Sequence, residues 1–473
     1  FLVFGKAGFY LNTPQITHPE IELLTEENKY AKNFLEPVYP GTEKLKARGM
    51  GGRQMGNLTL TLLKLLSEKE IPENIPENIL GKFRLVKRYE AFNNIHFPST
   101  ISDYENAVKR LKFEELFLSQ FRMGLLRFKR HTFSKGLVFS KVGNYFNEFY
   151  QNHLPFELTG AQKRVLKEIR KDIGSGKQMN RLLQGDVGSG KTMVALMTML
   201  IAADNGFQSC FMAPTEILAR QHFASLNTML HNIPLKIGIL TGSSTAKEKR
   251  EVLNATKEGE IAILTGTHAL IEDAVQFKDL GLAIVDEQHR FGVAQRAKLW
   301  DKNDVNPHIL VMTATPIPRT LALTAYGDLD YSIMDEMPPG RIPITTVHRM
   351  EYARPQVMDF IKTEIKKGRQ AYIIYPLIEE SAKLDFENLM KGYEEVKAYF
   401  PEPKYYISMV HGRQKSGQKQ TNMNRFVKGD TQIMVSTTVV EVGVNVPNAS
   451  VMVIESAEKF GLPQLHQLRG RVG

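Results

Sequence analysis

The sequence predicts an α/β protein with two doubly wound parallel-sheet domains, and three observations support that fold class. Short apolar segments alternate with helix-length segments twice, over residues 151–341 and again over residues 342–473. A glycine-rich stretch, GDVGSGKT at residues 185–192, separates a strand candidate from a helix candidate. The apolar run Leu282–Val285 ends in the polar residues Asp286–His289. Polar residues at strand ends are typical of the ligand-binding edge of a parallel sheet.

Residues 1–150 do not show this alternation. Residues 1–25 mix aromatic, apolar and polar side chains with glycines, which predicts the last strands of a small β domain. The chain begins at Phe1 without the pattern of a signal peptide, so we expect it to be a fragment of a longer protein. Residues 26–150 form a mixed region, in which helical spacing predicts helices at residues 58–66 and 107–127.

Each sheet domain can be divided into strands at its apolar runs. The first contains strand candidates at Arg181–Gln184, Gln208–Ala213, Lys236–Leu240, Ile261–Leu264, Leu282–Val285 and Ile309–Thr313. Residues 337–341, which read MPPGR, predict a short linker. The second contains strand candidates at Thr345–His348, Ala371–Tyr375, Tyr405–Val410, Gln432–Ser436 and Val451–Glu455. Two domains joined by a short hinge create a cleft that a bound nucleotide can open and close.

Residues 185–192 have the composition of a phosphate-binding loop. The glycines let the backbone turn tightly, so that several N–H groups point at one phosphate chain. Lys191 adds a positive charge for the β and γ phosphates, and the Thr192 hydroxyl is suited to Mg2+. We therefore expect ATP to contact the whole loop, which consists of Gly185, Asp186, Val187, Gly188, Ser189, Gly190, Lys191 and Thr192. The alternative is a glycine-rich turn that binds no nucleotide, but such a turn rarely has a strand before it and a helix after it.

The polar residues after Leu282–Val285 supply the second half of a hydrolysis site. Parallel strands bring their carboxyl ends to one edge, so we expect Asp286 beside the phosphate loop, where it holds Mg2+ through water. Glu287 is then placed to orient and deprotonate the attacking water. Gln288 and His289 follow as candidate sensors of the γ-phosphate. A solvated turn is the alternative for such an acidic pair taken alone.

Composition limits the class of protein. The 473 residues suffice for about three domains, and 42% hydrophobic residues can fill their cores. No segment is apolar enough to predict a membrane span. The single cysteine, Cys210, excludes an internal disulfide and a cysteine-based metal cluster, which indicates a reducing cytoplasm. The net charge of +10 suits a polyanionic partner, although surface solvation explains most charge runs equally well.

Further motifs follow one another in a fixed order around the phosphate loop. They are LTGAQ at residues 158–162, APTE at 213–216, TGTH at 265–268, TATP at 313–316, STTVVEVGV at 436–444 and QLHQLRGRVG at 464–473. In this order the set resembles the superfamily 2 helicases. The resemblance implies two RecA-like motor domains, residues 151–341 and residues 342–473.

Longer segments resemble the RecG branch of the DNA helicases, and the resemblance covers nearly the whole chain. They are NIHFP at residues 94–98, FEELF at 113–117, DEQHRFGVAQR at 286–296, MTATPIPRTLALTAYGDLDYS at 312–332, YPLIEES at 375–381 and HGRQKSGQK at 411–419. The resemblance implies an oligonucleotide-binding-fold (OB) wedge domain, of which residues 1–25 are the tail, and a helical linker region over residues 26–150. In the family the last motif continues with another arginine, and this sequence stops at Gly473, just before that position.

The resemblance also implies roles in ATP hydrolysis for single residues. Gln162 reads the adenine base. Arg471 reaches from the second motor domain as an arginine finger, which stabilises the charge that develops during phosphoryl transfer. The catalytic set is then Glu287, Asp286, Lys191 and Arg471.

Contacts with DNA and the coupling of DNA to ATP follow from the same resemblance. The residues that match positions at the DNA backbone are Thr215, Arg220, Thr267 and Thr437. The coupling residues are Gln288, His289, Thr313 and Thr315. For the threonines the alternative role is a helix cap, and for Arg220 it is a solvated helix position.

These patterns predict an ATP-dependent DNA helicase or translocase that uses ATP and Mg2+. Its expected substrates are branched and forked DNA, including stalled replication forks and Holliday junctions, in DNA repair and recombination. We expect a monomer in the bacterial cytoplasm, associated with the nucleoid and not with a membrane, and single-stranded DNA-binding protein as a further partner.

Two alternative functions remain open. A duplex translocase similar to the transcription-repair coupling factor has phosphate-loop and TATPIPRT motifs of the same style, but DEQHRFGV and YPLIEES disfavour it. A non-catalytic DNA-binding scaffold with a silent nucleotide site is disfavoured by the intact catalytic set.

Overall fold

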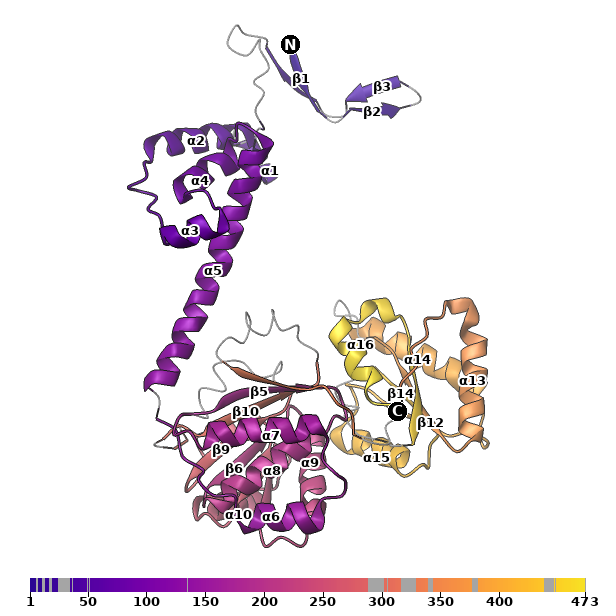
Figure 1. The fold of residues 1–473 in the computed structure, drawn as a ribbon. Helices are drawn as coiled ribbons and strands as arrows, with labels where there is room; N and C mark the ends of the chain where they lie inside the picture. Colours follow the sequence, from indigo (N-terminus) through magenta and orange to yellow (C-terminus); the bar gives the residue numbers. More distant parts are fainter. Residues whose placement is uncertain are drawn as a thin grey trace. The chain divides into compact units, whose positions relative to one another are not determined.

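The computed structural model describes the chain except for residues 6, 11–12, 17–18, 24–34, 36, 49, 51, 134, 288–301, 304, 316–328, 339–342, 377–381, 438–445, 447 and 473. The chain forms two compact units, residues 1–122 and residues 123–473 (Figure 1). Helix α5 (Ile101–Phe133) contains the boundary between them.

The first unit begins with short strands, as the sequence predicts for residues 1–25. They form two antiparallel pairs, which are β1 (Leu2–Phe4) with β4 (Glu20–Glu22) and β2 (Ala7–Tyr10) with β3 (Thr13–Ile16). The helices that follow are α1 (Glu43–Ala47), α2 (Gly52–Leu65), α3 (Glu77–Phe83), α4 (Arg88–His96) and the first part of α5. The two helices predicted from spacing correspond to α2 and α5.

A buried ion network holds the first unit together. The Arg110 side chain of α5 is fully buried, and its guanidinium lies 2.7 Å from Glu114 Oε2 and 2.5 Å from Glu73 Oε1. Asn74 completes the network, because its amide donates to Glu114 Oε1 at 2.6 Å and accepts from Arg110 Nη2 at 3.2 Å. A buried guanidinium needs such compensation to offset its lost hydration. The network therefore fixes the loop before α3 to α5.

The second unit contains a seven-stranded parallel sheet in the order β11-β5-β10-β9-β6-β8-β7. Its strands are β5 (Asn180–Gly185), β6 (Gln208–Met212), β7 (Ile237–Leu240), β8 (Ile263–Gly266), β9 (Leu280–Val285), β10 (His308–Thr313) and β11 (Asp330–Met334). Six of these were predicted, and β11 was not. As an edge strand that is buried only at alternate positions, β11 lacks the continuous apolar run that marks the others.

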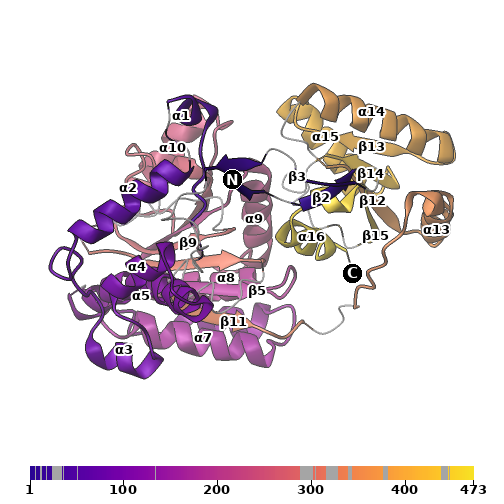
Figure 2. The same ribbon diagram turned by 90° about the horizontal axis from the view of Figure 1, so that it is seen from above.

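Helices cover both faces of this sheet. They are α6 (Asn144–Glu148), η1 (Phe149–His153), α7 (Gly160–Ile173), α8 (Lys191–Asp204), α9 (Glu216–Met229), α10 (Ala246–Lys257) and η2 (His268–Ile271). Alternate residues of the strands enter two separate cores, one of which contains α7 and α8 and the other the apolar side of α10. Figure 2 shows α7 and α8 on one side of the sheet and α10 on the other. Helix α8 is apolar on nearly all sides, as expected of a fully buried helix.

The segment of residues 136–139, which precedes the predicted domain boundary at residue 150, packs against this domain. Its backbone donates from Gly136 N to Gly176 O and from Phe139 N to Ile173 O, both at 2.9 Å. His308 of β10 joins it to the sheet, because Nδ1 accepts from Met179 N and Nε2 donates to Leu137 O, each at 2.9 Å. This sheet domain thus includes residues that the sequence assigned to the helical linker region.

A second sheet, also parallel, has the order β13-β14-β12-β15. Its strands are β12 (Gln370–Ile374), β13 (Ile407–Val410), β14 (Ile433–Ser436) and β15 (Ala449–Ile454). Its helices are η4 (Glu351–Ala353), α13 (Arg354–Lys366), α14 (Ala382–Tyr399), α15 (Ser416–Val427), η5 (Ala457–Lys459) and α16 (Leu462–Arg469). None of the helices in the described ranges is both long and apolar enough to cross a membrane.

One predicted strand of this domain is wrong. Residues 345–348 belong to neither described sheet, and their side chains are largely exposed. The β-branched residues there favour an extended backbone, but a strand also requires a neighbour, and β15 rather than this segment pairs with β12. Part of the predicted linker at residues 337–341 lies outside the described residues.

The buried histidine of β10 should make the stability of the first motor domain depend on pH. Burial lowers the pKa of His308 from 6.5 to about 4. Between these values the unfolded chain binds a proton that the folded domain excludes, so the free energy of unfolding falls as pH falls. Between pH 7 and pH 5, we expect the free energy of unfolding to fall by about 2 kcal/mol less in His308→Gln than in the unchanged protein. Urea unfolding at both pH values, followed by circular dichroism, measures the difference.

The matched control is the exposed His231→Gln, which should leave the pH dependence as in the unchanged protein. Equal pH dependence in the His308→Gln and unchanged proteins would contradict the assignment of the buried neutral imidazole.

Candidate functional site

The predicted phosphate-binding loop lies between the end of β5 and the start of α8. Gly188 and Gly190 have φ angles of 82° and 87°, a left-handed conformation that glycine adopts without strain. Gly190 also meets the side chain of Gln162, because an added Cβ would lie 2.2 Å from Gln162 Nε2. Both the backbone angle and the close approach therefore require glycine at this position.

Gln162 supports the loop from α7. Its Oε1 accepts from Thr159 N at 2.9 Å, which forms a capping box, and its Nε2 donates to Ser189 O at 3.1 Å. The side chain is fully buried. The structure thus places the predicted adenine-reading residue directly against the phosphate loop.

Lys191 is the first residue of α8, and its ammonium group turns back over the loop. Nζ donates to Gly185 O at 2.7 Å and to Asp186 O at 2.8 Å. Burial lowers the pKa of Lys191 to about 8, while the nearby Asp286 and Glu287 oppose that shift. The ammonium is therefore held among backbone carbonyls and two carboxylates at the carboxyl edge of the sheet.

Asp286 follows β9 directly, and both of its carboxylate oxygens are engaged. Oδ1 accepts from Glu287 N at 3.1 Å, and Oδ2 lies 3.0 Å from His222 Nε2. Burial opposes ionisation, but the hydrogen bond and charge of His222, aided by Lys191, keep the pKa of Asp286 below its usual value. The carboxylate is therefore ionised and fixed in orientation.

Glu287 has the opposite electrostatic environment. Burial, and then the charge of Asp286, raise the pKa of the Glu287 carboxyl. Its backbone has a φ of 53°, a left-handed conformation that costs a non-glycine residue about 1–3 kcal/mol. A strained, buried carboxylate whose pKa is raised above its usual value has the properties of a general base.

Helix α16 of the second sheet domain lies against these residues of the first. His466 Nε2 is 2.8 Å from Asp186 Oδ1, and Gln467 Nε2 donates to Glu287 Oε1 at 3.2 Å. After the helix, a Cβ added to Gly470 would lie only 2.5 Å from Val187 Cβ.

Arg471, the predicted arginine finger, comes one residue later. Its charge acts on all three buried groups, since it contributes to the lowered pKa of Lys191 and of Asp286 and opposes the rise at Glu287. The two sheet domains thus form one polar site.

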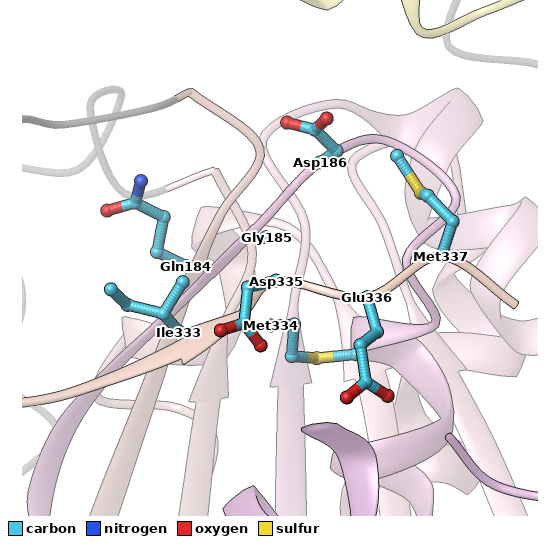
Figure 3. A pocket seen from close by; sticks show the side chains of 8 residues that line it. All are labelled: Gln184, Gly185, Asp186, Ile333, Met334, Asp335, Glu336 and Met337. Atoms are coloured by element: carbon cyan, nitrogen blue, oxygen red, sulfur yellow. The ribbon is translucent and has the colours of Figure 1, made fainter. Parts of the chain in front are cut away.

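A cavity of about 230 Å³ opens beside the phosphate loop (Figure 3). It lies at the carboxyl ends of β5 and β11 and is lined by Gln184, Gly185, Asp186, Ile333, Met334, Asp335, Glu336 and Met337. Figure 3 shows the carboxylates of Asp335 and Glu336 directed away from Asp186. Ligand pockets usually enclose about 300–1,000 Å³, so this cavity has room for part of a nucleotide rather than the whole.

The predicted DNA-contact residues do not all have free side chains. Thr215 caps α9, because its hydroxyl accepts from Leu218 N at 3.4 Å. Arg220 donates to Glu216 Oε1 and to Ser243 Oγ, each at 2.9 Å. Thr215 thus has the alternative role of a helix cap. Arg220 is a partly solvated helix residue that also contacts neighbouring side chains.

The other two DNA-contact candidates are more enclosed. Thr267 is the residue before η2 but does not cap it with its side chain, and Thr437 follows β14. Both are buried, with 5% and 4% of their surface exposed. Contact with DNA at these positions would consequently involve the edge of a buried side chain or the backbone.

The predicted coupling residues are only partly described. Thr313 ends β10, and its Oγ1 lies 2.8 Å from Thr315 Oγ1 and accepts from Thr315 N at 3.2 Å. These two threonines therefore form one turn at the same sheet edge as Lys191. Gln288 and His289 lie outside the described residues.

Sequence reasoning missed the functional contacts of His222, His466 and Gln467. The last two lie within the quoted QLHQLRGRVG motif, so the motif could have identified them. His222 gave no such signal, because its proximity to Asp286 depends on how α9 packs on the sheet, where the His222 ring lies against Phe211 of β6.

The residues present fit a magnesium ion. No group of three or more His, Cys, Asp or Glu side chains suitable for a metal occurs in the described part of the chain. Mg2+ in phosphoryl-transfer sites does not need one, because it is usually held by one or two carboxylates, waters and the substrate phosphates. The ionised Asp286 and the hydroxyl of Thr192 supply suitable oxygen ligands.

Comparison with protein families identifies two helicase domains. The family described as DEAD/DEAH box helicase matches residues 159–324, and the helicase conserved C-terminal domain matches residues 355–473. These ranges correspond to the two sheet domains.

Individual relatives extend the match over the whole chain. The ATP-dependent DNA helicase RecG of Streptococcus pneumoniae is 48% identical over 93% of this chain and 64% of its own length. The Escherichia coli K12 protein of the same name is 41% identical over 100% of this chain and 68% of its own length. The chain spans only 54% of the Synechocystis relative, which is 44% identical.

A solved structure described as RecG bound to a three-way DNA junction also matches. Its TM-score is 0.72 at 39% identity, and the match covers 100% of this chain and 61% of that one. The helicase MrfA bound to DNA has a TM-score of 0.53 at 19% identity over 72% of this chain, which shows the fold alone.

The close approach of Gly470 to Val187 gives a test of the contact between the two domains. Gly470→Ala would place its Cβ 2.5 Å from Val187 Cβ, far inside the roughly 3.5–4.0 Å at which carbon atoms pack. We expect α16 to move away from the phosphate loop. The distance distribution between spin labels at Glu258→Cys and Lys428→Cys, both exposed, should therefore lengthen or broaden.

Gly417→Ala in α15 is the matched control, because nothing lies within 4 Å of its added Cβ. It should leave the distribution unchanged. An unchanged distribution in Gly470→Ala would show that the contact does not set the distance between the domains.

Proposed function

Because the chain belongs to the RecG family of ATP-dependent DNA helicases, we propose that it hydrolyses ATP to move along DNA and remodels branched DNA. Stalled replication forks and Holliday junctions are the proposed substrates, in DNA repair and recombination. The observation that carries the proposal is the contact of α16 with the phosphate loop and Glu287, since it completes a hydrolysis site from two domains. Opening and closing of such a site converts hydrolysis into movement of one domain against the other.

ATP binding is assigned to residues 185–192 and the residues around them. The backbone N–H groups of the loop and the ammonium of Lys191 receive the phosphates, so Lys191 must exchange its bonds to two carbonyl oxygens for the ligand. Thr192 and Asp286 are the proposed ligands of Mg2+. When bound, that ion supplies a positive charge that neutralises the β and γ oxygens.

Hydrolysis is assigned to Glu287 and Arg471. The Glu287 carboxylate accepts a proton from the attacking water as its oxygen bonds the γ phosphorus and the bond from that phosphorus to the β–γ bridging oxygen breaks. The raised pKa of Glu287, caused first by burial, supports this role. Arg471 stabilises the developing negative charge. Arginine fingers are typically worth about 10³–10⁵ in rate.

The adenine base is assigned to the side of the loop that Gln162 and the cavity beside β11 occupy. Glu336, which lines the cavity, accepts from Ala161 N at 2.9 Å, so the cavity and the first turn of α7 are joined. Each polar atom of the Gln162 amide already has a partner, but the amide retains one further donor and one further acceptor. Reading adenine therefore uses this remaining donor and acceptor.

DNA is assigned to Thr215, Arg220, Thr267 and Thr437, through contacts with the phosphate backbone that do not depend on sequence. Thr313 and Thr315, together with Gln288 and His289, are proposed to couple those contacts to ATP. A relative whose structure is described as RecG bound to a three-way junction supports branched DNA as the partner. We further propose a monomer in the bacterial cytoplasm at the nucleoid, with single-stranded DNA-binding protein as a partner.

The assignment of Glu287 is tested by Glu287→Gln, which removes the proton acceptor but keeps the size of the side chain. We expect ATP turnover to fall by about 10²–10⁴, as is typical for loss of a general base. Binding of ATP, measured by calorimetry, and binding of a synthetic fork should remain. Glu258→Gln, an exposed carboxylate of the same domain, is the control.

Turnover unchanged by Glu287→Gln would remove Glu287 from the catalytic set. If the unchanged protein showed no DNA-stimulated phosphate release, the silent scaffold would replace the motor. RNA polymerase as the main protein captured would favour the translocase alternative.

Gln162→Ala separates recognition of the base from support of the loop. If Gln162 reads adenine, the variant should lose its preference for ATP over GTP, because the lost bonds to Thr159 and Ser189 affect both nucleotides, whereas the adenine contact is specific to ATP. We expect the ratio of ATP to GTP affinities to fall by about 10-fold, the equivalent of one or two hydrogen bonds. Equal losses for both nucleotides would instead assign Gln162 to support of Ser189 alone.

A further inference from the structure

Helix α9 places a histidine against the acidic edge of the nucleotide site. His222 lies about two turns after the start of α9, and its Nε2 is 3.0 Å from Asp286 Oδ2. Both side chains are largely buried, with 14% of each exposed. A hydrogen bond to an ionised carboxylate in such a place is shorter and stronger than a neutral one and is not diluted by water.

The position of the His222 ring is fixed by the strands that also position Asp286. The ring packs on Phe211 of β6, with a centroid distance of 4.5 Å and an interplanar angle of 31°. Strand β6 pairs with β9, where Phe211 is opposite Ile284, and Asp286 N donates to Met212 O at 2.9 Å. His222 and Asp286 therefore approach each other on a rigid frame.

The other carboxylate oxygen of Asp286 accepts from Glu287 N at 3.1 Å. With one donor at each oxygen, the plane of the carboxylate cannot turn freely. A carboxylate offers about four lone-pair directions, so two remain available to a metal or its bound water. The orientation in which they are offered is set by His222 together with the backbone.

We propose that His222 is a positioning residue for Mg2+, whose Nε2–H holds the Asp286 carboxylate in the orientation that receives the ion bound to ATP. The inference rests on the proposed function and adds to it a residue outside the recognised motifs. Residues that orient metal ligands in this way typically account for about 10–100-fold in metal affinity or activity.

Two substitutions separate the hydrogen bond from the packing. His222→Phe keeps an aromatic ring that can pack on Phe211 but removes the donor. His222→Gln loses the ring but retains an N–H at the position of Nε2. Positioning by hydrogen bond predicts that His222→Gln resembles the unchanged protein and His222→Phe does not. A purely structural role predicts the reverse.

The readout is the affinity for ATP with Mg2+ present and with EDTA, measured by calorimetry at a temperature where turnover is negligible. We expect the gain in affinity from Mg2+ to fall by about 10–100-fold in His222→Phe and by less than about 3-fold in His222→Gln. Affinity in EDTA should be the same in all variants, which shows that the phosphate loop is intact. His231→Phe, an exposed histidine after the same helix, is the control.

The outcomes distinguish this inference from the proposed function. If the unchanged protein hydrolyses ATP and gains affinity from Mg2+, but His222→Phe does so equally, the positioning role is wrong and the proposed function stands. Loss of the Mg2+ effect in His222→Gln as well as in His222→Phe would assign His222 to packing alone. Absence of any Mg2+ effect or turnover in the unchanged protein would overturn the proposed function itself.

Discussion

The parallel register of the first sheet is the constraint on which the candidate site depends. Strand β10 lies between β5 and β9, and all three run in one direction. Their last residues, Gly185 of β5, Val285 of β9 and Thr313 of β10, therefore lie at a common edge of the sheet. The residues that follow those ends are the phosphate loop, the acidic pair and the Thr313–Thr315 turn. Any shift of one strand would separate the phosphate loop from the carboxylates. The full burial of β9 and β10, and of β5 except at the half-buried Gln184, opposes such a shift.

Burial at that edge makes the charged groups depend on one another. Lys191, the adjacent pair Asp286 and Glu287, and Arg471 come from three distant segments of the chain. The charges of the others, Arg471 included, contribute to the pKa values of Lys191, Asp286 and Glu287. At Asp286, His222, Lys191 and Arg471 outweigh the effect of burial and lower the pKa, whereas burial and then the adjacent Asp286 raise the pKa of Glu287. One carboxylate is therefore suited to a metal and the other to a proton, although they are adjacent in sequence.

Sequence predicted the parts of the fold that carry continuous apolar runs and the parts of the site that carry motifs. Strands β5 to β10 were predicted from their apolar runs, and the phosphate loop was predicted from its motif. The missed strand β11 is buried at only two of its five positions and half-buried at the others. The wrong strand at residues 345–348 has suitable residues but no neighbour. His222 was missed for a different reason, since a single histidine on a helix carries no signal until the packing of α9 over β6 brings it to Asp286.

Helix α16 contacts the first domain at two places. His466 and Gln467 are adjacent, and they reach two different parts of the site, Asp186 in the phosphate loop and Glu287 after β9. Because both residues lie on one rigid helix, docking of α16 brings both side chains to their partners. When the two domains close, α16 therefore contacts the phosphate loop and the proposed general base at the same time. A nucleotide that displaced only one of these contacts would leave the helix docked, so release of α16 requires a change at both.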